Sequence, residues 1–214
     1  MNWSLYAAFA LAAYLLGSVP FAYLFAKLNG VDIRKVGSGN VGATNVFRAV
    51  GKGWGIATFA ADALKGFVPA WLFPLLARRW GVECGPGLGL LGGCAAIAGH
   101  SWPVFLKFRG GKGVATSAGM LLGVAPAAVG IGLLVWVAVF AVTRFVSVAS
   151  IAVSVAVPAA AWLLYGRAGA LLPSVLTVLG VLVIWRHRSN IARLRRGEEH
   201  RWGRPRAAAS PPSP

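Results

Sequence analysis

The sequence has few charged residues, and acids are almost absent. Of its 214 residues only five are Asp or Glu, against 21 Lys and Arg, and charged residues make up 12% of the chain. Soluble globular domains average about 25% charged residues, so this shortage excludes an ordinary soluble domain. Because 57% of the residues are hydrophobic, the composition indicates one bundle of membrane-spanning helices.

Cysteine and histidine are also scarce. The two cysteines, Cys84 and Cys94, form neither a disulfide framework nor a metal-ligand pattern, and we interpret both as packing residues. None of the three histidines is followed by Asp five residues later, and no G-x-S-x-G elbow is present. These absences argue against a Ser-His-Asp triad, a His-x-x-x-x-Asp base and a metal site, and no cofactor is expected.

Apolar runs close to 20 residues long, the length that crosses a bilayer, recur along the chain. The clear spans are residues 3–25, 54–76, 87–105, 145–165 and 170–185. Residues 114–142 contain Pro126 and form either one long tilted helix or two helices with a turn near residues 123–126.

The basic residues lie between these apolar runs, so nucleic acid is not an expected partner of this chain, despite its net charge of +16. Two crossings in residues 114–142 give seven spans and place most basic residues on one face, whereas six spans divide them. The positive-inside rule therefore favours seven, with the N-terminus outside and the C-terminus cytoplasmic. We expect an all-α membrane domain over residues 1–193 and a basic, Pro/Ala-rich, largely disordered tail over 194–214.

A polar, glycine-rich loop at residues 36–48 follows the first span. Its glycines allow a tight curl with N–H groups turned inward, which suits an anion. The loop matches G-x-G-x-x-G, but no strand precedes it, so a dinucleotide site is not expected. We predict phosphate binding by its polar side chains, which are Ser38, Asn40, Thr44, Asn45 and Arg48.

A second basic and glycine-rich segment, residues 107–113, precedes an apolar helix. It lacks the upstream glycine of a P-loop, but glycines and a lysine at a helix N-terminus still favour negative charge. The candidate contacts to a substrate are Lys107, Gly110, Gly111, Lys112 and Gly113.

Three polar residues inside the apolar spans have a structural and a functional interpretation. Asp62 and Lys65 are spaced i, i+3 on one helix, so they form a neutralised pair, or Lys65 faces a substrate cavity. A single histidine such as His100 is more often a hydrogen-bonded packing residue.

Polar residues also flank the last two spans. If the final helix continues, His187, Asn190 and Arg193 share one face. Ser147 and Ser150 lie three apart at the same predicted level. A basic flank and a functional site explain these residues equally well.

Together these segments resemble one family, the acyl-phosphate-dependent glycerol-3-phosphate acyltransferases, or PlsY family, of bacterial membranes. The matching stretches are GSGNVGATNVFR at residues 37–48, DALKG at 62–66, GHSWPVFLKFRGGKGVATS at 99–117, the serine pair 147 and 150, and RHRSNIAR at 186–193. Arg109 stands where lysine is expected in many members, and the arginine-rich tail resembles an extension.

The resemblance implies an enzyme of the bacterial cytoplasmic membrane whose active site lies on the cytoplasmic face. It would move a fatty acyl group from acyl phosphate to glycerol 3-phosphate, releasing lysophosphatidic acid and phosphate as the first step of phospholipid synthesis. Its partners would be these substrates, membrane lipid and the enzyme that makes acyl phosphate. The catalytic residues implied are Ser38, Arg48, Lys112, His187 and Asn190, with Ser147 or Ser150 as a further contact.

Two questions stay open at this point. The general base is either His187 or the acceptor's own phosphate, and the shortage of carboxylates favours the phosphate. The alternative function is a transporter of a phosphorylated small metabolite, although the sequence shows no internal repeat of the kind common in transporters.

Overall fold

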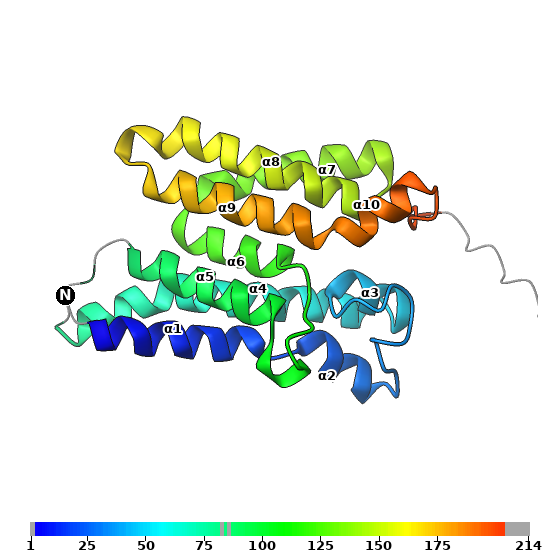
Figure 1. The fold of residues 1–214 in the computed structure, drawn as a ribbon, viewed down its shortest axis with the longest axis horizontal. Coiled ribbons are helices and arrows are strands. Elements are labelled where there is room, and N and C mark those ends of the chain that lie inside the picture. The colour runs from blue at the N-terminus through cyan, green and yellow to red at the C-terminus, as the bar shows by residue number, and fades with distance from the viewer. Residues whose placement is uncertain (1–2, 82–83, 85–86, 204–214) are drawn as a thin grey trace, which may run out of the picture.

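The computed structural model describes residues 3–81, 84 and 87–203, which form helices and turns and no strand. Helices lie in two stacked groups, with α1, α4 and α5 in one and α7, α8 and α9 in the other, and α6 lies between them (Figure 1). The α-helices are α1 (Trp3–Ser18), α2 (Phe21–Leu28), α3 (Ala43–Ala49), α4 (Lys52–Arg79), α5 (Gly87–Ser101), α6 (Val114–Val124), α7 (Pro126–Thr143), α8 (Val146–Tyr165), α9 (Leu171–Arg186) and α10 (Arg188–Arg195). Single 3-10 turns occupy Val104–Leu106 and Gly166–Ala168.

Several helical segments in the described part of the chain, some of them made of two neighbouring elements, are long and apolar enough to cross a membrane. Five segments qualify, Trp3–Leu28, Lys52–Arg79, Gly87–Leu106, Pro126–Thr143 and Val146–Ala168, and a sixth does if α9 is joined to α10 across a 51° bend. The α6 helix has 11 residues, about 16 Å at 1.5 Å per residue, roughly half of the hydrocarbon thickness. A helical membrane bundle is confirmed, and the count of seven spans and their orientation stay predictions.

Prolines explain two breaks in the helical pattern. The first apolar run divides at Val19 and Pro20 into α1 and α2, and residues 114–142 divide at Ala125, directly before Pro126. Proline lacks an N–H group and disfavours a helical residue before it. Of the two interpretations of residues 114–142, two helices are therefore the observed one.

Small residues let α6 approach α4 closely. A side chain at Gly66 would collide with the backbone of Thr116, and one at Gly119 would collide with the backbone of Ala63. Such contacts are typical of helix packing in membranes, where small residues allow backbones to approach. This packing fixes the start of α6, which follows the basic segment 107–113.

Candidate active site

The polar segments singled out in the sequence gather at one end of the bundle. The α2, α3 and α10 helices lie there, and α1 begins at the opposite end (Figure 1). The connection between α5 and α6, which carries Lys112, also reaches this end.

Asn45 organises the loop before α3. Its side chain is buried, and its Nδ2 donates to the carbonyls of Ile33 (3.2 Å), Val36 (3.0 Å) and Asn40 (3.1 Å). Its Oδ1 accepts a hydrogen bond of 3.2 Å from the backbone N–H of Ser38. These bonds use the amide of Asn45 within the loop, so it shapes the loop, while Ser38 is exposed beside it.

The centre of the site is a hydrogen-bonded chain that joins four segments. Lys112 Nζ donates to Asn190 Oδ1. Asn190 Nδ2 and Ser147 Oγ donate to Glu199 Oε1 at 2.7 and 2.9 Å, and Arg193 Nε donates to Glu199 Oε2 at 2.7 Å. The structure therefore brings together residues that are far apart in the sequence, from the start of α6, the first turn of α8, α10 and the segment that follows α10.

The sequence did not predict Glu199. The predicted domain boundary at Arg193 falls inside α10. Residues 196–203 come directly after that helix and include Glu199, whereas residues 204–214 lie outside the described part of the chain. Burial raises the pKa of Glu199, but the hydrogen bonds from Asn190, Arg193 and Ser147 outweigh it, so the pKa lies below its ordinary value. In the sequence, the only indication was the presence of a glutamate in a basic tail. The contacts of its carboxylate with Ser147, Asn190 and Arg193 are visible only in the folded structure.

Trp202 covers the neighbouring side of the site. Its ring packs against Phe47 of α3 at 5.0 Å and Phe140 of α7 at 6.1 Å, and its backbone N–H donates to the carbonyl of Arg144 at 2.8 Å. The guanidinium of Arg48 lies 5.5 Å from the same ring, which is a cation–π distance. The tail thus holds Arg48 at the edge of the site.

His187 lies at the bend between α9 and α10 and is 2% exposed. Its Nδ1 is 2.8 Å from the carbonyl oxygen of Val183. Because that carbonyl can only accept, Nδ1 carries the proton and the neutral ring presents Nε2 as an acceptor. Burial, followed by the charge of Lys112, lowers the pKa of His187 to about 4, so the ring is neutral at pH 7.

Lys112 is shifted in the same direction. Burial lowers its pKa, Glu199 opposes this shift, and the charges of Arg193 and Arg48 add to it, so that the pKa lies at about 8. The ammonium group is therefore charged at pH 7 and begins to lose its proton in mildly alkaline solution.

Other predicted contacts differ in their placement. Ser150 donates to Val146 in its own helix at 2.8 Å, so Ser147 is the serine that joins the cluster. Lys107 is exposed at the end of the 3-10 turn, Thr44 and Asn40 are half-buried, and Gly113 is the N-cap of α6.

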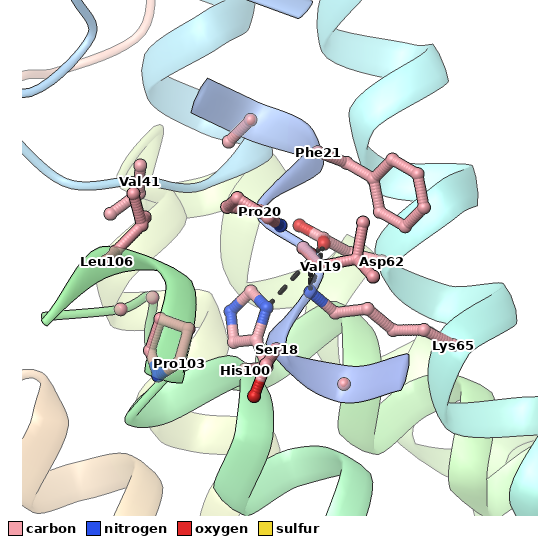
Figure 2. Close-up of a pocket in the computed structure, with 14 residues that line it drawn as sticks. Ser18, Val19, Pro20, Phe21, Val41, Asp62, Lys65, His100, Pro103 and Leu106 are labelled. Atoms are coloured by element: carbon pink, nitrogen blue, oxygen red, sulfur yellow. Dashed lines mark hydrogen bonds and ion pairs between the residues drawn. The ribbon is translucent and has the colours of Figure 1, made fainter. Parts of the chain in front are cut away.

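Asp62, Lys65 and His100 form a separate buried cluster (Figure 2). Lys65 Nζ lies 2.8 Å from Asp62 Oδ1 and donates to the Val19 carbonyl at 2.9 Å, and His100 Nδ1 lies 3.6 Å from Asp62 Oδ1. The adjoining cavity has a volume of about 10 Å³, room for one water molecule. These distances favour the structural interpretation, in which the cluster braces α4, α5 and the break after α1.

Within residues 3–81, 84 and 87–203, no three His, Cys, Asp or Glu side chains converge as ligands would. What the site offers is cations, amide and hydroxyl donors, and one neutral imidazole, which suit an anionic substrate.

Comparison with known proteins identifies the family of this chain. The sequence model of the family described as "Glycerol-3-phosphate acyltransferase" matches residues 7–197. The chain belongs to that family. A glycerol-3-phosphate acyltransferase of Methylobacillus flagellatus is 46% identical over 199 residues, covering 92% of this chain and 97% of the relative. One of Aquifex aeolicus is 45% identical over 194 residues, covering 89% and 95%.

Solved acyltransferase structures share the fold. PlsY (YgiH), an integral membrane glycerol 3-phosphate acyltransferase, matches in its glycerol 3-phosphate form with a TM-score of 0.83 and 42% identity over 92% of this chain and 96% of that one. Its lysophosphatidic acid form matches with a TM-score of 0.80 and 41% identity over 92% and 95%. The chain is therefore an integral membrane protein of the acyltransferase family, as the resemblance implied.

Proposed function

We propose that this protein transfers a fatty acyl group from acyl phosphate to the first hydroxyl of glycerol 3-phosphate, giving 1-acylglycerol 3-phosphate and inorganic phosphate. The reaction would be the first step of phospholipid synthesis at the cytoplasmic face of a bacterial cytoplasmic membrane. The observation that carries the proposal is the convergence of Lys112, Asn190, Ser147 and Arg193 around one carboxylate.

The charge of this cluster suits a phosphate. Arg48, Lys112 and Arg193 act electrostatically on one another, and Glu199 is the acid among them. With Arg186, which also acts on Lys112, four positive charges against one negative charge leave a net charge of +3 in the cluster. A phosphate dianion bound there would offset most of this charge, which a single carboxylate does not.

The chemistry needs no acyl-enzyme, because acyl phosphate is already activated. The hydroxyl oxygen of the acceptor bonds to the acyl carbon, the bond between that carbon and the phosphate oxygen breaks, and the hydroxyl proton is removed. Holding both substrates in one site gives effective molarities of about 10⁵–10⁸ M in well-oriented cases. Lys112, which bonds to Asn190 and directly precedes the N-cap of α6, and the N–H groups of the first turn of α6 are expected to stabilise the developing oxyanion and the departing phosphate.

The pH dependence of kcat/KM distinguishes the two candidate bases. If Nε2 of His187 accepts the proton, the rate rises with pH through about 4, the pKa of this ring; if the acceptor's phosphate does, it rises near a pKa of about 6. On the alkaline side, kcat/KM is expected to fall through about pH 8 as Lys112 loses its charge. Profiles of kcat/KM against pH for the wild type and His187→Ala test this. If His187 is the base, its replacement removes the fall in rate on the acid side; if it is not, that fall remains.

The choice of acyl donor tests the proposed function itself. Purified protein would receive glycerol 3-phosphate with either palmitoyl phosphate or palmitoyl-coenzyme A, and the product would be identified by mass spectrometry. Palmitoyl phosphate is expected to yield 1-acylglycerol 3-phosphate, and the thioester to yield little. Product from the thioester alone would contradict the proposed donor while leaving the family unchanged.

A further inference from the structure

Arg186, the last residue of α9, makes contacts that the proposed chemistry does not use. Its NH2 group donates to the carbonyl of Gly110 at 2.8 Å and to that of Gly111 at 2.6 Å, and its Nε donates to Gly111 at 3.1 Å. The guanidinium carbon lies 5.6 Å from the ring of Trp102, which supports one face of the group as a cation–π contact.

The two glycines are held from their other side by α5. The N–H of Gly110 donates to the carbonyl of Ser101 at 3.2 Å, and that of Gly111 to the carbonyl of His100 at 3.1 Å. Both glycines are required here, because a side chain at Gly110 would meet the backbone of His100 and one at Gly111 would meet its ring. Arg186 therefore closes a clamp on the two residues that directly precede Lys112.

Arginine is suited to this position and lysine is not. Its planar fork presents several N–H groups in a fixed geometry, so one side chain can satisfy two neighbouring carbonyls. Arg186 is also followed directly by His187 and precedes Asn190, in the first turn of α10, by four residues. The same residue thus ties the segment that carries Lys112 to the segment that carries the histidine and the amide.

We propose that Arg186 is a positioning residue that sets the place of Lys112 relative to Asn190 and His187. This role rests on the proposed function, since a fixed Lys112 matters because it contacts substrate phosphate. Arg186 acts through the loop and does not itself contact substrate. Arg188 provides a matched control, because it is exposed and its guanidinium lies 4.4 Å from the ring of Trp185, with a 3.5 Å bond to that residue's carbonyl.

The first test measures the loop without reference to catalysis. Hydrogen–deuterium exchange of purified protein would follow a peptide covering residues 107–113 in wild type, Arg186→Met and Arg188→Met. Faster exchange confined to this peptide in Arg186→Met alone is the expected result. Unchanged exchange in this peptide would contradict the proposal, because it would mean that Arg186 does not hold the loop. Faster exchange across all helices would contradict it as well, because Arg186 would then have a general folding role.

The second test measures the consequence for the reaction. With palmitoyl phosphate and glycerol 3-phosphate, kcat/KM is expected to fall about 100-fold in Arg186→Met, the size of effect that a misplacement of about 1 Å produces. Arg186→Lys keeps the charge but loses the fork, so an intermediate loss is expected, while Arg188→Met stays near wild type. Full activity in Arg186→Lys and Arg186→Met would overturn the positioning role. An inactive wild type would instead refute the proposed function, and the exchange experiment would still report on the clamp.

Discussion

Replacing Lys112 with alanine is expected to reduce turnover by about 10³-fold while the protein still folds. The ammonium group of Lys112 donates a hydrogen bond to Asn190. Among the residues that the structure describes, Lys112 is the only lysine in the hydrogen-bonded chain around Glu199. Loss of one preorganised donor to a developing oxyanion costs about 10²–10³ in kcat, and the phosphate also loses a charge partner. The measurement is phosphate release from palmitoyl phosphate in detergent or lipidic mesophase.

A second lysine serves as the control for this prediction. Lys52 is exposed at the start of α4, so Lys52→Ala removes a charge without touching the cluster and should keep near-normal rates. Lys112→Arg should retain part of the activity and lose the alkaline limb near pH 8, since arginine stays charged. A rate near wild type in Lys112→Ala would remove Lys112 from the mechanism.

Replacing Glu199 with alanine is expected to destabilise the protein in its ligand-free state. Its side chain is 5% exposed and accepts bonds from Ser147, Asn190 and Arg193. Removing one partner of a fully buried ion pair costs roughly 3–5 kcal/mol, because the remaining charge is left uncompensated. The Arg193 side chain is 27% exposed, so water screens this pair in part and a smaller loss is expected. Thermal unfolding measures this loss, and inorganic phosphate should restore more stability to Glu199→Ala than it adds to the wild type.

The adjacent acid provides the control for Glu199. Glu198 is exposed and pairs at 2.7 Å with Arg196, which is exposed as well, so Glu198→Ala should unfold like the wild type. The pKa of Glu199 is lowered in the folded protein, so its stabilising effect is present above the ordinary glutamate pKa and is lost as the pH falls through the lowered value. Equal stability of Glu199→Ala and wild type at pH 7 would contradict this role.

The helical framework could be predicted from the sequence, because proline and apolar length leave local signals. The division before Pro126 was one of two predicted arrangements, and the backbone shows it. The α3 helix was not predicted, since six of its seven residues lie inside the glycine-rich loop 36–48. Length and composition do not decide whether α6 crosses the membrane or ends part-way.

Residues of the candidate site could be predicted where several polar or basic residues lie close together in one segment of the sequence. They could not be predicted where the contact depends on packing between distant segments. Lys112, His187 and Asn190 come from glycine-rich or basic stretches with a clear pattern. Ser147 and Ser150 have the same spacing signal, and only the packing of α8 shows that Ser147 joins the cluster. Glu199 binds residues that lie 6, 9 and 52 positions away in the chain, and no local pattern encodes the contact with Ser147.

The most direct test of the account is the dependence of phosphate release on the acceptor. Purified wild-type protein would be given palmitoyl phosphate with increasing glycerol 3-phosphate, and inorganic phosphate would be followed over time. The account predicts release that is negligible without glycerol 3-phosphate, rises to saturation with it, and is matched by 1-acylglycerol 3-phosphate. No release, or release at the same rate without glycerol 3-phosphate, would contradict it.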